Sequence, residues 1–347
     1  MSIKANIGGV WKAINNVKVN INGVWKQVQK YSANVDGVWK TVWQYLGDWS
    51  LIQRLGSENY AYSLCSLGSG VVLAGTDPTG QIYKSTDSGD NWSLIGRLGS
   101  ETRVYSLCSL GSGIVLAGTY PTGQVYKSTN SGDSWSLIGQ LGSETRVHSL
   151  VSLGGGIVLA GTGANGKIYK STDSGDNWSL IQGLGSESYV FSLVSLGSGI
   201  VLAGTGINGK VYKSTNSGDS WSLIDQLGSE NYTYSFCSLG SGIVLAGTYP
   251  TGQVYKSTDS GDSWSLVQRL GSEEGIPSLC YLGGGIVLAG TGNTGQIYKS
   301  VDSGDSWSLV QRLGDETYVW TLVSPSTGIV LAGTSNTGEI YKYVYVP

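Results

Sequence analysis

The sequence predicts an all-β protein, a seven-bladed β-propeller of four-stranded blades that follows an N-terminal module of β-hairpins. The blades are predicted by a repeat of constant length, because seven tryptophans follow one another every 43 residues from Trp49 to Trp307. Each repeat contains four short strand-like segments separated by turn residues, and no segment keeps a helical period. A period in the low forties with four strands is the length of one propeller blade.

The copy at residues 103–138 shows how one blade is expected to form. Four apolar or aromatic segments are separated by Gly, Ser, Asn, Asp and Pro, which are turn-forming residues. We expect strands at residues 103–110, 113–119, 123–129 and 134–139. The Trp of each repeat is expected to pack between neighbouring blades.

The two ends of the repeat array are complementary. The last copy supplies three strands, at residues 318–323, 329–334 and 339–344, and lacks a fourth. Residues 48–52 form an unpaired copy of a fourth strand ahead of the first complete blade. We therefore predict a propeller over residues 48–347 whose ring is closed by residues 48–54 joining the last blade, which removes exposed sheet edges.

Residues 1–47 carry a separate repeat of 14 residues, marked by Trp11, Trp25 and Trp39. Gly-Gly, Asn-Gly and Asp-Gly pairs precede these tryptophans, and such pairs between apolar residues predict three consecutive β-hairpins. A module of this size seldom buries enough surface to be stable alone. We expect it to mediate attachment or oligomerisation.

Charge and hydropathy argue against several partners. The formal net charge is −3, whereas nucleic acid and anionic membranes attract basic surfaces. No stretch approaches the roughly 18 apolar residues of a membrane helix, and the first residues lack the apolar core of a secretory signal. We expect no nucleic-acid partner, no membrane insertion and no signal peptide.

The cysteines and the histidine do not predict a metal or redox site. Cys65, Cys108, Cys237 and Cys280 occupy one repeat position, where the other copies carry Val, so buried free thiols are expected. The only histidine, His148, has no second His or Cys on the same face to complete a metal cluster or a catalytic triad. We expect no metal and no cofactor.

The segment Ser85-Thr86-Asp87-Ser88-Gly89-Asp90-Asn91-Trp92 recurs in six copies and resembles the Asp-box, or bacterial neuraminidase repeat. An Asp or Asn side chain can accept backbone N–H bonds within such a turn, so the box is interpreted as a folding device. Sialidases with this repeat have six blades, three clustered arginines and a Tyr/Glu nucleophile pair. This chain has seven repeats and spreads its arginines over equivalent positions, so the resemblance implies fold rather than activity.

Variation among the seven copies is concentrated at the start of the first strand and in the turn between the second and third strands. Both places emerge on one face of an antiparallel blade. Aromatic rings and nearby polar groups suit sugars and peptides, although neutral drift in loops is the alternative. The expected ligand-binding residues are Tyr60, Tyr62, Arg103, Tyr105, Tyr120, Arg146, His148, Tyr189, Tyr232, Tyr234, Tyr249, Tyr318 and Trp320, on a face that also carries Phe191.

The acidic residues do not predict an active site. Glu58 and its equivalents recur in every blade and are expected to brace a turn. The non-repeated acids Asp77, Asp225, Glu274 and Glu339 form no evident catalytic pair for glycoside hydrolysis. No catalytic residue is predicted.

The functional prediction combines these features. The Gly-Val-Trp-Lys hairpin repeats resemble short repeats in structural proteins of tailed bacteriophages. We expect a non-enzymatic phage or prophage tail component that recognises a cell-surface glycan or protein, located in the virion or the cytoplasm, with a homo-oligomeric or phage structural contact through residues 1–47. The alternatives are a glycoside hydrolase of the Asp-box type, like xyloglucan-type hydrolases, and an assembly scaffold, like photosystem assembly factors.

Overall fold

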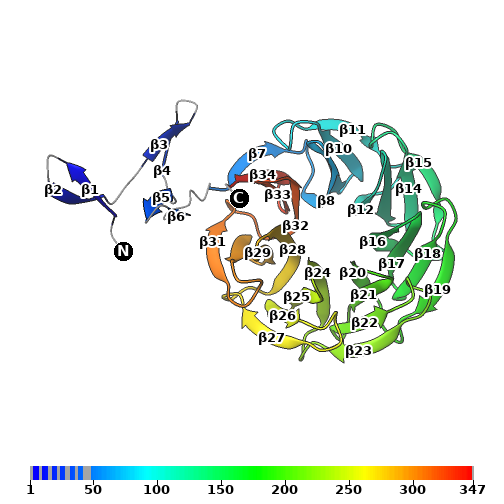
Figure 1. Ribbon diagram of the computed structural model, residues 1–347. Helices are drawn as coiled ribbons and strands as arrows, with labels where there is room; N and C mark the ends of the chain where they lie inside the picture. Colours follow the sequence, from blue (N-terminus) through cyan, green and yellow to red (C-terminus); the bar gives the residue numbers. More distant parts are fainter. Residues whose placement is uncertain are drawn as a thin grey trace. The chain divides into compact units, whose positions relative to one another are not determined.

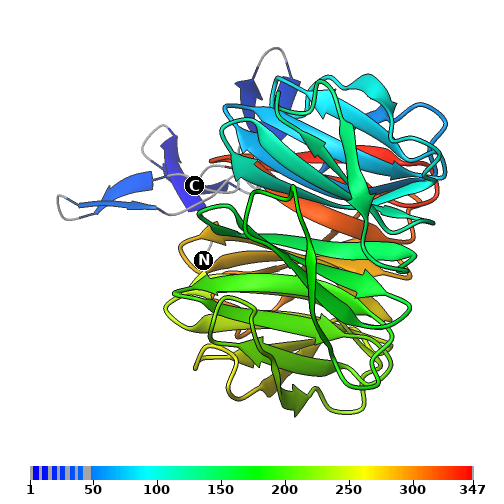
Figure 2. The same cartoon turned by 90° about the vertical axis from the view of Figure 1, so that its right-hand side faces the viewer.

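The computed structural model describes residues 48–345, together with the backbone of six strands between Ile3 and Thr41. All the regular secondary structure in this part of the chain is β-strand. Seven four-stranded sheets surround a common centre, as seen along the propeller axis in Figure 1 and from the side in Figure 2. The predicted all-β, seven-bladed fold is confirmed.

Each blade is an antiparallel meander that runs from an inner to an outer strand. The first three blades are β8 (Tyr60–Gly68), β9 (Val71–Asp77), β10 (Gln81–Ser85) and β11 (Ser93–Arg97); β12 (Arg103–Gly111), β13 (Ile114–Tyr120), β14 (Gln124–Ser128) and β15 (Ser136–Gln140); and β16 (Arg146–Gly154), β17 (Ile157–Gly163), β18 (Lys167–Ser171) and β19 (Ser179–Gly183). The next three are β20 (Val190–Gly197), β21 (Ile200–Thr205), β22 (Lys210–Ser214) and β23 (Ser222–Gln226); β24 (Tyr232–Gly240), β25 (Ile243–Tyr249), β26 (Gln253–Ser257) and β27 (Ser265–Arg269); and β28 (Gly275–Gly283), β29 (Ile286–Gly292), β30 (Gln296–Ser300) and β31 (Ser308–Arg312).

The seventh blade is assembled from both ends of the repeat array. It consists of β32 (Val319–Ser326), β33 (Ile329–Thr334), β34 (Glu339–Val344) and β7 (Ser50–Arg54), in that order. β7 pairs antiparallel with β34, with Arg54 opposite Glu339 and Ser50 opposite Lys342. The fourth strand that the last copy lacks is therefore supplied by the segment just before the first complete blade.

The hydrophobic core lies between the blades. One buried cluster combines Leu55, Tyr83 and Trp92 with Leu331 of the seventh blade. The second strand of each blade contributes more to this core than the other strands, because its Val-Leu-Ala residues are almost completely buried. The repeat Trp packs in these interfaces as predicted, but the fourth strand begins after it, at Ser136 in the second blade. The Trp135 indole donates to Gly132 O at 3.0 Å and so belongs to the preceding turn.

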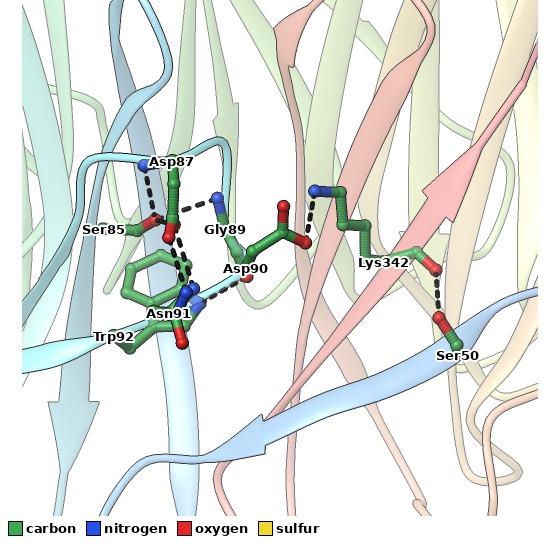
Figure 3. Close-up of polar contacts among 8 residues, drawn as sticks. All are labelled: Ser50, Ser85, Asp87, Gly89, Asp90, Asn91, Trp92 and Lys342. Atoms are coloured by element: carbon green, nitrogen blue, oxygen red, sulfur yellow. Dashed lines mark hydrogen bonds and ion pairs between the residues drawn. The ribbon is translucent and has the colours of Figure 1, made fainter. Parts of the chain in front are cut away.

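The turn from Ser85 to Trp92 is held by its own side chains (Figure 3). Asp87 accepts from the backbone N of Asn91 at 2.9 Å, and Ser85 Oγ accepts from the N of Gly89 at 2.9 Å. Hydrogen bonds to Asn91 are the leading cause that lowers the pKa of Asp87 to about 2. The Asp of this turn is thus engaged in local structure.

An ion-pair ladder links successive blades through these turns. The third-strand Lys of one blade binds the Asp that lies two residues before the Trp of the next turn, and Lys342 Nζ lies 2.7 Å from Asp90 Oδ1 across the ring closure (Figure 3). The other described pairs are Lys84–Asp133, Lys127–Asp176, Lys170–Asp219, Lys213–Asp262 and Lys256–Asp305. Each pair joins two blades, so the turns also connect the sheets laterally.

The repeated glutamates brace the opposite face. Glu58 is fully buried and accepts hydrogen bonds from the backbone N and the hydroxyl of Thr79. In the third and fourth blades a lysine replaces part of this contact, with Lys167 bound to Glu144 and Lys210 bound to Glu187, both at 2.9 Å. These acids therefore fix the connection between the second and third strands.

Residues 3–41 contain three two-stranded antiparallel sheets, as the hairpin repeat predicts. The predicted turn pairs at residues 8–9, 22–23 and 36–37 lie outside the described residues. The role of residues 1–47 in attachment stays a prediction. The strands are β1 (Ile3–Ile7), β2 (Val10–Ile14), β3 (Lys18–Ile21), β4 (Val24–Gln27), β5 (Ser32–Val35) and β6 (Val38–Thr41).

All four cysteines are buried free thiols. Burial raises the pKa of Cys65 to about 11, so its thiol stays protonated and unreactive. Among the described residues, no group of three or more His, Cys, Asp and Glu side chains is placed to hold a metal ion. The described residues also include no helix that could serve as a membrane span.

Candidate functional site

Each inner strand contains a β-bulge near its start. In β8 the register shifts between Ala61, opposite Thr76, and Ser63, opposite Gly75, so Tyr62 has no partner in β9. The same shift occurs in the other six inner strands. Bulges redirect side chains at functional sites. The residues in these bulges that face the centre, here called the inner ring, are Tyr62, Tyr105, His148, Phe191, Tyr234, Pro277 and Trp320.

The small residues after each bulge bring neighbouring inner strands together. Ser63 Oγ donates to Val104 O in the next blade at 3.1 Å. Gly75 lies against the same neighbour, because a Cβ added there would come within 2.6 Å of Val104 Cγ1. The Gly and its close approach occur in every blade, whereas the bulge residue is Tyr in three blades and His, Phe, Pro or Trp in the others.

The inner ring and Arg146 line one central pocket of about 270 Å³. The rings contact one another in sequence around it. The centroid distances are 5.4 Å for Tyr62–Tyr105, 4.5 Å for Tyr105–His148, 5.0 Å for His148–Phe191, 5.1 Å for Phe191–Tyr234 and 5.0 Å for Tyr62–Trp320. Pro277 stands between Tyr234 and Trp320 and completes the circle.

A supporting layer of larger side chains packs behind the inner ring. Tyr318 stacks on Trp320 with a centroid distance of 4.7 Å, and Tyr232 stacks on Tyr249 at 5.2 Å. The layer consists of Tyr60, Arg103, Tyr120, Tyr189, Tyr232, Tyr249 and Tyr318. These stacks restrict the rotamers of the inner ring and thereby preorganise the pocket.

The two arginines of this face have different environments. Arg103 Nε lies 3.0 Å from Asp77 Oδ1, and its Nη1 donates to Tyr105 Oη at 2.9 Å. Arg146 has no carboxylate within ion-pair distance among the described residues. Its guanidinium carbon lies 4.9 Å from the centroid of the Tyr120 ring and 5.6 Å from that of Tyr189, so it is held by cation–π contacts.

His148 is neutral in this pocket. Burial is the main cause that lowers its pKa, to about 3, and the positive charges of Arg146 and Arg103 act in the same direction. Burial also raises the pKa of Tyr62 and Tyr234, so both hydroxyls stay protonated. Since Asp77 balances Arg103, the pocket retains the single positive charge of Arg146.

Three buried polar nitrogens at the pocket have no hydrogen-bond partner in the described structure. They are Arg146 Nε, His148 Nε2 and Trp320 Nε1. The guanidinium and indole nitrogens are obligatory donors, whereas the imidazole nitrogen donates or accepts according to its tautomer. An unpaired buried donor costs about 1–3 kcal/mol. These three nitrogens are therefore polar atoms at the pocket wall that the protein itself leaves unsatisfied.

The structure brings six of the thirteen predicted ligand-binding residues to the pocket wall: Tyr62, Tyr105, Arg146, His148, Tyr234 and Trp320. The other seven form the supporting layer. Pro277 lines the pocket but was missed, although its 43-residue spacing from Tyr234 and Trp320 could have indicated it. Asp77 is not among the predicted ligand-binding residues, but its contact with Arg103 gives it a positioning role at this face.

Comparisons with known proteins support the fold. No protein-family model matches the sequence, and no curated protein is significantly similar to it. Among solved structures, YCF48 bound to D1 peptide is 18% identical with a TM-score of 0.70 and is matched over 85% of this chain and 96% of that one. The WD40 repeats of RRP9 are 12% identical with a TM-score of 0.72, over 87% and 100% of the two chains.

An enzyme is also among the similar structures. The GH74 xyloglucanase from Xanthomonas campestris is 13% identical with a TM-score of 0.68. The match covers 85% of this chain and 53% of the xyloglucanase. At such identities the likeness shows the propeller fold alone, because propellers with unrelated functions share it.

Proposed function

We propose that this chain is a non-enzymatic binding protein that recognises a cell-surface glycan in the central pocket. The observation that carries the proposal is a preorganised aromatic wall in which Arg146, His148 and Trp320 each have a polar nitrogen without a protein partner. Aromatic faces pack against the apolar faces of sugar rings, and donors bind sugar oxygens. A pocket of about 270 Å³ suits a small terminal group of a larger glycan.

A binding role is favoured over hydrolysis by the composition of the pocket wall. Glycoside hydrolysis commonly uses two carboxylates that flank the scissile bond. None of the eight described residues that line the pocket is acidic. The nearby Asp77 is ion-paired with Arg103, so it is poorly placed to act as a catalytic carboxylate.

The proposal includes a biological setting. The turn from Ser85 to Trp92 resembles the Asp-box, and the Gly-Val-Trp-Lys repeats resemble those of tailed-phage structural proteins. We place the chain at the tail of a phage or prophage particle, where residues 1–47 attach or oligomerise the protein and the propeller meets the host surface.

One experiment tests binding and catalysis together. Purified full-length protein is incubated with bacterial cell-wall and capsule polysaccharides, and both retained protein and released reducing sugar are measured. Retention without release is expected. Steady release that a single acid substitution abolishes would instead identify a hydrolase.

A peptide is the second candidate ligand, because the similar structure of YCF48 holds a D1 peptide. The same pocket chemistry, a cation surrounded by aromatic rings, also suits a peptide carboxylate. Retention on immobilised peptides with no retention on any polysaccharide would favour this reading and a scaffold role.

A further inference from the structure

The polar groups of the central pocket are asymmetric. Arg146 and His148 line the pocket from the third blade, whereas the fourth, fifth and sixth blades contribute Phe191, Tyr234 and Pro277. A ligand must therefore present an acceptor-rich group to one side of the pocket and an apolar face to the other.

The charge of that group follows from the ion pairs. Asp77 neutralises Arg103, and His148 carries no charge at neutral pH, so Arg146 is the single uncompensated charge. Its Nε has no partner, and its Nη1 makes only a long contact of 3.4 Å with Tyr189 Oη. A guanidinium with free N–H groups matches the two oxygens of a carboxylate.

We propose that the central pocket selects saccharides whose terminal ring carries a single carboxylate, and that Arg146 binds that carboxylate. This inference rests on the proposed glycan-binding function and names its ligand class. Phe191 and Tyr234 line the opposite side of the pocket and pack on the sugar face. A monoanion fits better than a phosphate dianion, because the pocket offers one unbalanced positive charge.

Two substitutions of Arg146 test this inference. Tyr occupies the position of Arg146 in four other blades, at Tyr60, Tyr189, Tyr232 and Tyr318, so Arg146→Tyr is compatible with the local fold. Arg146→Lys keeps the charge but loses the planar pair of donors. The comparison uses an array of uronic-acid oligosaccharides beside the same oligosaccharides with their carboxyl groups reduced to alcohols.

The full-length protein is expected to prefer the uronic-acid form by about 10- to 100-fold, the effect of one charge-assisted hydrogen-bonded contact. Arg146→Tyr should abolish that preference while keeping the melting temperature within a few degrees, and Arg146→Lys should retain part of it. Binding to neutral sugars alone, a preference that survives Arg146→Tyr, or selectivity for sulfated or phosphorylated sugars would overturn the inference but leave glycan binding intact. Binding to peptides with a free C-terminal carboxylate and to no saccharide would overturn both proposals.

Discussion

Glu316 in the seventh blade has a neighbour that no other blade provides. Its side chain is buried, and Thr337 Oγ1 donates to its Oε1 at 2.6 Å. Burial is the main cause that raises its pKa, to about 7, and the charge of Glu339 adds to the shift. Gln81 occupies the position of Glu339 in the first blade, where it accepts from Tyr83 Oη at 2.9 Å, as Glu339 accepts from Tyr341 Oη.

Glu339→Gln is expected to stabilise the protein more at pH 8 than at pH 4. A carboxyl whose pKa is higher in the folded state contributes stability below its unfolded pKa near 4.5, and that stability is lost as the pH rises through 7. Gln removes the charge of residue 339, and one pKa unit corresponds to about 1.4 kcal/mol. We expect a gain in the free energy of unfolding on the order of 1 kcal/mol at pH 8 and little change at pH 4.

Urea unfolding at both pH values measures this difference. Gln253→Glu in the fifth blade is the reverse control, because it creates the same carboxyl pair with Glu230. A gain from Glu339→Gln that is equal at pH 4 and pH 8 would show that charge repulsion is not its cause.

The two arginines show where residue-level prediction ends. Both stand at the same repeat position, so the sequence marks them as equivalent candidates. Their difference depends on Asp77, which lies beside Arg103 only after the first and second blades pack together. Two arginines at the same repeat position therefore differ in their contacts. Arg103 is ion-paired with Asp77, whereas Arg146 Nε has no hydrogen-bond partner.

At the scale of single elements, the second strands carry a Gly whose role is steric. A Cβ at Gly118 in β13 would come within 2.6 Å of Val147 Cγ1 and of Ser106 Oγ. By contrast, a Cβ at Gly139 in β15 of the same blade would meet no atom within 4 Å. Neither glycine has a positive φ, so an alanine at either position would meet no backbone strain.

Gly118→Ala is therefore expected to destabilise the protein by about 1–3 kcal/mol through overpacking between the second and third blades. Gly139→Ala should be neutral or slightly stabilising, since it only restricts the unfolded chain. Chemical denaturation of the two variants beside the parent protein measures the contrast. Equal effects would indicate that the inner strands do not need this close approach.

Strand prediction succeeded where the pattern is local. The expected strands at residues 103–110 and 113–119 differ by one residue from β12 and β13 at their boundaries. The bulges were not predicted. They occur where the neighbouring blade lies against Gly118 and its equivalents, and the sequence of a single repeat does not show that contact. The bulge turns Tyr105 toward the centre, so the pocket wall depends on a tertiary contact that the sequence pattern does not reveal.

For the molecule as a whole, ring closure depends on a short segment. Gln53 of β7 exchanges two hydrogen bonds with the backbone of Trp92 in the first blade, both at 3.1 Å, while β7 itself pairs with β34. Leu55 is fully buried in the cluster that joins the first and seventh blades. These contacts complete the seventh sheet and link it to the first.

A truncation pair tests this closure. Removing residues 1–55 deletes β7 and Leu55, leaves the edge of β34 unpaired and opens the buried cluster, so the melting temperature should fall sharply or the protein should aggregate. Removing residues 1–44 deletes no strand of the seven sheets and should leave the melting temperature close to that of the full chain. Leu55→Ala in the full chain isolates the core contribution and should cost about 2–5 kcal/mol. Differential scanning calorimetry compares these three variants with the full chain, and equal melting temperatures for the two truncations would show that the ring closes without its N-terminal strand.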